Sequence, residues 1–182
     1  MNPRRIVGAI ALLAIPVVSI SLVSVSSDAA TPPTDQPLAQ QRLTPPDIAA
    51  LAAARPPSPT GVQMTNLIGD PTRPGLYTVR VAIAAHTQAK PHTHRDNRSV
   101  IVMSGTWHMG YGTQFDTKAM KDLPPGSVYT EPAGQPHFAQ TTDEPVVIHV
   151  TGYGPSDTQF VAQQDRSGAL SLTPDSRAVR AD

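Results

Sequence analysis

The 182-residue chain has no cysteine and few aromatic or charged residues, which make up 4% and 15% of it. Without cysteine it can form no disulfide, no thiolate metal site and no cysteine nucleophile. Its 14 basic and 14 acidic residues cancel, which argues against the basic surface of a non-specific nucleic-acid binder. The balanced charge predicts no nucleic-acid partner. The length predicts a single domain.

A long uncharged run near the N-terminus is the clearest targeting signal. Residues 6–25 follow Arg4 and Arg5, and small residues lead up to Ala29. This layout is typical of a secretory signal. We predict a signal peptide over residues 1–29, cleavage after Ala29 and a periplasmic or secreted protein. The alternative is an uncleaved anchor, because about twenty apolar residues can span a bilayer; otherwise no membrane association is expected.

Proline separates a linker from the domain that follows. Eight of the 20 prolines fall within residues 30–60, and a sheet cannot run through so many missing donors. Within this stretch Thr44 can cap a helix, Pro45 can occupy its first position, and residues 47–54 are good helix formers. We predict a Pro-rich linker over 30–60 that carries one short helix and tethers the domain. Residues 165–182 are polar and are predicted to form a flexible C-terminal tail.

Residues 61–164 have the texture of a β-structure. Short runs of β-branched and apolar residues alternate with turn residues rich in glycine and proline. Residues 77–83 alternate strictly, with Val79, Val81 and Ile83 on one face, as in a half-buried antiparallel strand. Many short strands with almost no helix predict an all-β sandwich or barrel.

All six histidines lie in this β-region: His86, His92, His94, His108, His137 and His149. His92 and His94 are two residues apart, so on a strand both side chains project from the same face. Two neighbouring imidazoles suit a metal ion. Such a pair also occurs as surface or core residues, so by itself it leaves both interpretations open.

A second group of residues gives the histidines a context. The segment 126–141 resembles the second motif of the cupin family, G-x5-P-x-G-x2-H-x3-N. The matching positions are Gly126, Pro132, Gly134 and His137, with Thr141 in place of the asparagine.

The first cupin motif, G-x5-H-x-H-x3,4-E-x6-G, is matched less completely. His92, His94 and Gly105 are in register, whereas His86 replaces the leading glycine and Arg98 occupies the glutamate position. The resemblance implies a double-stranded β-helix, or jelly-roll barrel, over residues 61–164. It also implies that His92, His94 and His137 hold a divalent transition metal (Fe, Mn, Ni, Zn or Cu).

Turn chemistry supports the same picture for His137. Gly126 and the Pro132–Gly134 turn bracket a strand, and Pro136 stiffens the approach to His137. We therefore expect His137 to begin a strand that faces His92 and His94 across the barrel. Three imidazoles with an open position form a recognised catalytic metal site.

Arg98 is the departure from the family with the largest consequence. In metal-binding cupins the glutamate at this position supplies a fourth ligand and a negative charge. An inward positive charge about 6 Å from a divalent ion would cost on the order of several kcal/mol. Two alternatives remain open: Arg98 pairs with a carboxylate such as Asp96, Asp116 or Glu131, or it binds an anionic ligand bidentately. The candidates for a substitute metal ligand are Glu131, His86, His108 and His149.

Two functions follow from the resemblance. The first is an exported metal-dependent enzyme of the dioxygenase, isomerase or decarboxylase type, acting on a small oxygen-rich molecule in the barrel. The second is a non-catalytic cupin with a degenerate or absent metal site, in which Arg98 and Glu131 contact the small-molecule ligand. Cupins also pair through edge strands, so a homodimer is a further expectation.

Overall fold

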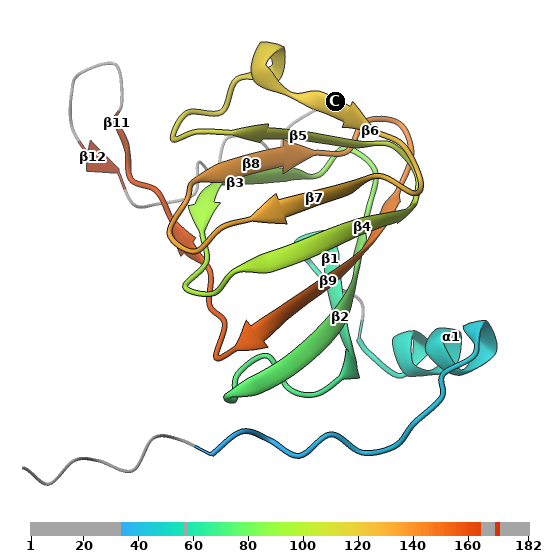
Figure 1. The fold of residues 1–182 in the computed structure, drawn as a ribbon. Coiled ribbons are helices and arrows are strands. Elements are labelled where there is room, and N and C mark those ends of the chain that lie inside the picture. The colour runs from blue at the N-terminus through green and yellow to red at the C-terminus, as the bar shows by residue number, and fades with distance from the viewer. Residues whose placement is uncertain (1–33, 57, 165–169, 172–182) are drawn as a thin grey trace, which may run out of the picture. The chain divides into compact units, whose positions relative to one another are not determined.

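Two antiparallel sheets form the body of the molecule in the computed structural model, which describes residues 34–56, 58–164 and 170–171 (Figure 1). The predicted signal peptide, residues 1–29, lies outside the described residues. The elements are α1 (Pro45–Ala53), β1 (Val62–Ile68), β2 (Gly75–Ile83), β3 (Gln88–Thr93), β4 (Arg98–Ser104), β5 (Trp107–Tyr111), the 3-10 turn η1 (Thr117–Ala119), β6 (Lys121–Leu123), β7 (Val128–Glu131), β8 (His137–Gln140), β9 (Val146–Gly154), β10 (Gln159–Phe160), β11 (Gln163–Gln164) and β12 (Leu170–Ser171).

The order of the strands is that of a jelly roll. One sheet has the order β1-β2-β9-β4-β7 and the other β10-β3-β8-β5-β6, and β11 pairs with β12. Between β3 and β10 the chain crosses repeatedly from one sheet to the other, so neighbours within a sheet are distant in sequence. The all-β class with one short helix is therefore confirmed, and the non-local pairing is what brings the sequence motifs together.

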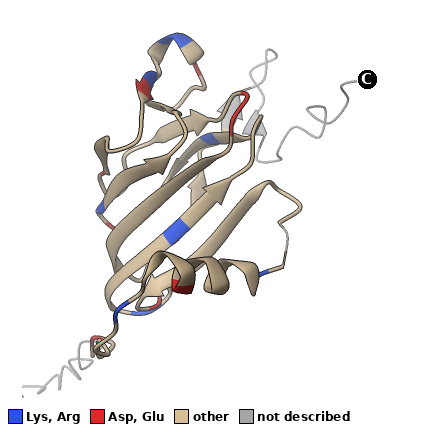
Figure 2. Ribbon diagram, turned by 90° about the vertical axis from the view of Figure 1, so that its right-hand side faces the viewer, with Lys and Arg blue, Asp and Glu red and all other residues tan. Residues whose placement is uncertain are grey.

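The core lies between the two sheets and is built by alternation. On β2 the side chains of Tyr77, Val79, Val81 and Ile83 are buried, while the residues between them are more exposed. This confirms the face predicted from the sequence. The central strands β9 and β4 and the opposing β5 and β8 complete the core with Val146, Ile148, Val150, Val100, Val102, Trp107, Met109 and Ala139. Figure 2 shows charged residues thinly spread over the sheets.

The described part of the proline-rich stretch is hydrogen-bonded to the β-domain. The backbone N–H of Gln36 donates to the carbonyl of Pro74 (2.9 Å), its side chain exchanges hydrogen bonds with the backbone of Asp70 (3.0 and 2.8 Å), and Gln41 donates to the carbonyl of Leu67 (2.5 Å). Prolines cannot donate to a sheet, but amide side chains between them can. The linker is thus tied to the β1–β2 hairpin.

The short helix begins where the sequence predicts. Thr44 precedes α1, Pro45 is its first residue, and the Asp47 carboxylate accepts hydrogen bonds from the backbone N–H and hydroxyl of Thr44 (2.7 and 2.6 Å). Its Ile48 and Ala52 are partly buried. None of the helices within the described ranges is long and apolar enough to cross a membrane. The predicted tail, 165–182, lies outside them except for the two residues of β12.

The motif glycines owe their identity to backbone conformation. Gly105, Gly126 and Gly134 have φ values of +71°, +88° and +70°, in the left-handed region that glycine adopts without a Cβ penalty. His86, which replaces the leading motif glycine, also has a positive φ, +56°. The glycine conformation therefore persists at this position although the glycine does not. Histidine tolerates it better than a β-branched residue does.

This conformation makes a prediction for His86. Replacing it with glycine removes the left-handed penalty but adds unfolded-state entropy, so the free energy of unfolding should stay unchanged or rise by up to about 1 kcal/mol. His86→Val should lower it by about 1–3 kcal/mol. Urea denaturation of both variants measures the difference. The exposed contact of His86 with Asp143, 3.9 Å away, contributes little to either value. A glycine variant less stable than the valine variant would contradict the argument.

Candidate metal centre

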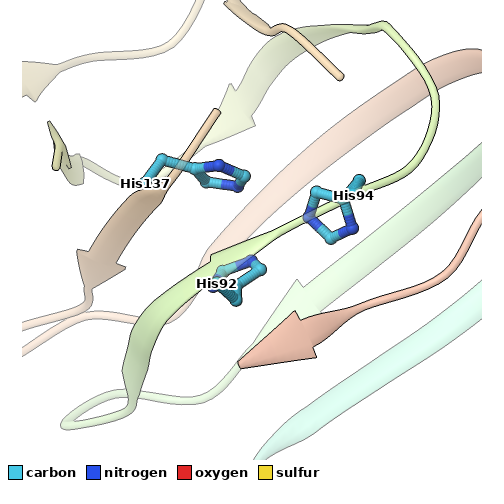
Figure 3. Close-up of side chains that lie close together, drawn as sticks. All are labelled: His92, His94 and His137. Carbon is cyan, nitrogen blue, oxygen red and sulfur yellow. The ribbon is translucent and has the colours of Figure 1, made fainter. Parts of the chain in front are cut away.

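Three imidazoles converge on the inner side of one sheet (Figure 3). His92 lies on β3, His94 follows its last residue, and His137 is the first residue of β8, as the sequence predicts. His92 and His137 are direct partners in the β3–β8 ladder, with ring centroids 4.4 Å apart. The expectation that His137 faces the pair across the barrel is therefore wrong. Strand pairing is non-local, and spacing alone could not reveal that β3 and β8 are neighbours.

Backbone carbonyls fix which nitrogen of each of the three rings carries the proton. The Nδ1 of His92 lies 2.6 Å from the carbonyl oxygen of Lys90, that of His94 2.5 Å from that of Asp157, and that of His137 3.2 Å from that of Gln135. A carbonyl only accepts, so each Nδ1 is the protonated donor. In the neutral rings Nε2 therefore carries a lone pair. Such second contacts are the rule for metal-binding histidines.

The ring nitrogens left over are buried without hydrogen-bond partners. His94 and His137 are each only 3% exposed, and the Nε2 of both lacks a partner in the described structure. One ligand atom from each of the three histidines lies within 4.8 Å of the others. Burial lowers the pKa of His92 and of His94 to about 4, so both rings are neutral at pH 7. The donor set thus fits a divalent transition metal.

Arg98 enters the barrel and is paired there. Arg98 on β4 stands directly opposite Glu131 on β7, and its Nε donates to the Glu131 Oε2 at 2.7 Å, with a second contact from Nη2. The side chain of Glu131 is buried and that of Arg98 is mostly buried, with 5% and 11% of their surfaces exposed. Burial, the largest single cause, raises the pKa of Glu131, and the charge and hydrogen bond of Arg98 lower it; the net shift is downward. Of the two alternatives for Arg98, the structure shows pairing with a carboxylate.

Glu131 also faces the histidines. Its Oε1 lies 3.4 Å from the Nε2 of His137, and its Oε2 lies 3.8 Å from the Nε2 of His94. The Tyr129 hydroxyl donates to Oε1 (3.1 Å) and accepts from the Trp107 indole N–H (2.9 Å). Burial, the largest cause, raises the pKa of Tyr129 well above its usual value. Tyr129 was not predicted to belong to the site, although strand alternation places it on the same face as Glu131.

The other carboxylates considered for Arg98 have different partners. Asp96 is buried and accepts a hydrogen bond from Tyr77 (2.6 Å), and Asp116 caps η1 by accepting from the backbone of Lys118 (2.9 Å). Burial and the bond to Asp96 raise the pKa of Tyr77 to about 12. The choice of Glu131 therefore follows from the β4–β7 register.

The remaining histidines lie outside the cluster. His86 is exposed, and the Nδ1 of His108 pairs with Asp122 at 2.7 Å. His149 alternates with the core residues of β9 and lies on the other face of that strand. None of the three belongs to the histidine cluster found among the described residues. As substitute ligands they are not supported by the structure.

A jelly roll with a mostly buried three-histidine cluster is the architecture that the two sequence motifs predict. The cupin family model matches residues 71–178, more than half of the chain, and both motifs fall within this range. The chain belongs to the cupin family. No curated protein sequence matches it significantly.

Solved structures offer distant likenesses. A polyketide cyclase, RemF, from Streptomyces resistomycificus has 17% identity and a TM-score of 0.49, covering 58% of this chain and 74% of its own. A cupin-superfamily sugar phosphate isomerase from Silicibacter pomeroyi has 21% identity and a TM-score of 0.45, covering 61% and 76%. A structure reported for the DMSP lyases RdDddP and RnDddQII has 20% identity and a TM-score of 0.44, covering 51% and 47%, so the chain spans about half of that protein. At these values the likenesses carry no argument about activity.

Gly152 lies beside the charged pair and yields a prediction. It is the β9 partner of Arg98, and a Cβ there would lie 2.5 Å from both the Tyr77 hydroxyl oxygen and the Asp96 Oδ2. Gly152→Ala should therefore separate Tyr77 from Asp96 and lower the free energy of unfolding by about 1–3 kcal/mol. Chemical denaturation measures this. Ser99→Ala, at an exposed position of β4, is the matched control and should change it by less than about 0.5 kcal/mol. Equal effects of the two variants would contradict the steric argument.

Proposed function

We propose that this protein is an exported cupin that holds a divalent transition metal with His92, His94 and His137 and binds a small oxygen-rich molecule at that metal. The observation that carries the proposal is the convergence of three imidazoles whose Nδ1 atoms are all engaged by carbonyls. The Nε2 atoms of His94 and His137 have no hydrogen-bond partner among the described residues. A divalent ion bound there would act as a Lewis acid or redox centre.

Backbone carbonyls and buried side chains orient the three rings and limit the access of water to the site. The carbonyls of Lys90, Gln135 and Asp157 orient the rings, and burial of His94 and His137 excludes water from their side of the site. His92 is less buried, and the ring of Phe160, 64% exposed on the neighbouring strand β10, lies 5.9 Å from it. We infer that a ligand approaches from this side.

The charge of the site favours an anionic ligand. Arg98 and Glu131 form a neutral pair, and the histidines are neutral when they bind a metal. The two positive charges of a divalent ion are therefore not compensated by the described side chains around it. A small molecule with a carboxylate, enolate or phosphate oxygen would supply the missing charge. Such a molecule is the class of substrate on which a dioxygenase, isomerase or decarboxylase at this site would act.

A non-catalytic ligand-binding role is the second candidate. The observation in its favour is Arg98 at the position where the cupin motif has a glutamate. Under this proposal the barrel binds the same class of molecule with a weak or absent metal. Turnover of small diols, keto acids and catechol-like compounds by the metal-loaded protein separates the two, because a binder retains affinity without turnover.

Metal content tests the histidine site. The purified protein, loaded with Zn²⁺ or Fe²⁺ and freed of excess ion, should retain about one ion per chain by mass spectrometry of metals. His92→Ala and His137→Ala should each weaken binding enough to abolish stoichiometric retention, since each removes one of the three histidine ligands. His108→Ala, which alters a histidine outside the cluster, is the control and should bind like the wild type. Equal metal loss in all three variants, or none in any, argues against the site.

Export is tested by the mature N-terminus. If residues 1–29 direct secretion, the full-length chain expressed in a bacterium should yield a periplasmic or secreted product that begins at Ala30. Intact mass measurement of the fractionated protein decides this. Arg4→Glu with Arg5→Glu removes the basic start of the signal and should retain the uncleaved chain in the cell. An uncleaved product in the membrane fraction would instead support the anchor.

A further inference from the structure

We propose that Glu131 of β7 is the carboxylate ligand of the metal, and that Arg98 is the residue that positions it. This deepens the proposed function and rests on the three-histidine site. In this chain the carboxylate is supplied from the strand paired with β4, and the guanidinium occupies the motif position that the glutamate has left.

The distances place the Glu131 carboxylate beside two of the three histidines, His94 and His137. Donors bound to one ion at 2.0–2.2 Å in tetrahedral geometry lie roughly 3.3–3.6 Å apart. The Glu131 Oε1 is 3.4 Å from the Nε2 of His137, and its Oε2 is 3.8 Å from the Nε2 of His94. The first spacing lies within this range and the second is slightly longer, so a small shift of the carboxylate would bring it to an ion held by the histidines, although among the described residues only the three histidines have ligand atoms that all lie within 4.8 Å of one another.

The facing atoms suit a cation. Each histidine Nδ1–H is engaged by a carbonyl, so in the neutral rings the Nε2 atoms that face Glu131 carry lone pairs. Carboxylate oxygens are also acceptors. Two imidazoles and a carboxylate therefore present acceptors to one buried space, and acceptors repel one another unless a positive ion lies between them. Arg98 donates a hydrogen bond to Oε2, but it donates none to the Nε2 of His94 or of His137.

Hydrogen bonds to both carboxylate oxygens fix the orientation of Glu131. Arg98 donates to Oε2 on one side, and Tyr129, itself bonded to Trp107, donates to Oε1 on the other. A carboxylate has about four lone-pair sites, so these bonds leave others for a metal. The register of β4 and β7 fixes Arg98 opposite Glu131, so the carboxylate cannot swing away without breaking the buried pair.

The experiment compares metal affinity in backgrounds with and without the carboxylate. Arg98→Gln retains Glu131 and removes the positive charge; Arg98→Gln with Glu131→Gln removes both charges and leaves a neutral pair that can still fold. Competition with a chromophoric chelator gives the Zn²⁺ dissociation constant. We expect the double variant to bind at least about 10–100-fold more weakly than Arg98→Gln. Arg98→Gln itself should bind as tightly as the wild type or more tightly.

Cobalt gives a readout that does not depend on affinity or activity. The visible spectrum of Co²⁺ in the wild type and in Arg98→Gln should share the same bands, whereas loss of the carboxylate should shift them and change their intensity. Glu144→Gln, the same carboxylate-to-amide change at an exposed residue outside the cluster, is the matched control and should retain the wild-type bands. Circular dichroism establishes that each variant is folded.

The outcomes separate this proposal from the metal site itself. Equal Zn²⁺ affinity and identical Co²⁺ spectra in Arg98→Gln and the double variant would overturn the role of Glu131, while the three-histidine site stood. If the wild type bound no metal and His137→Ala changed nothing, the proposed function would fail with it. A tenfold or larger difference together with altered cobalt bands would establish Glu131 as a ligand.

Discussion

Three imidazoles, two of them buried, can face one another in this barrel because each Nδ1–H already donates to a carbonyl. Leaving such a donor unpaired inside the protein would cost about 1–3 kcal/mol, so each carbonyl contributes to stability as well as to orientation. Two of them come from the residue two positions before the histidine, Lys90 for His92 and Gln135 for His137. The third, from Asp157, reaches His94 from the segment between β9 and β10. Two of the three ring orientations are therefore fixed by local backbone geometry, and the third is fixed by the tertiary fold.

The two sheets supply different parts of the site. Neutral donors come from β3 and β8, which pair side by side, whereas both charged residues come from β4 and β7 of the other sheet. Each pair is fixed by strand register, so a one-residue slip would send a ligand to the opposite face. Packing of the two sheets over a valine-rich core then sets the distance between charges and histidines.

Much of this could be predicted from the sequence, and the rest could not for identifiable reasons. Residue spacing predicted that His92 and His94 share a face and that His137 begins a strand, because these are local properties. It could not reveal the β3–β8 pairing, which joins segments more than forty residues apart. Nor could it select the partner of Arg98, because Asp96, Asp116 and Glu131 were equivalent until the register was known. The left-handed backbone at His86 likewise became visible only in the structure.

Arg98 on β4, at the motif position of a glutamate, with Glu131 opposite it on β7, changes the electrostatics of the centre more than its geometry. A carboxylate at the position of Arg98 would leave a bound divalent ion with one uncompensated charge, whereas the Arg98–Glu131 pair leaves two. At an effective dielectric near 20, a unit charge about 6 Å away changes the energy of a divalent ion by on the order of several kcal/mol. Part of that energy is recovered when an anionic ligand binds. The same substitution that weakens affinity for the metal therefore strengthens the preference for a negatively charged molecule at the open position.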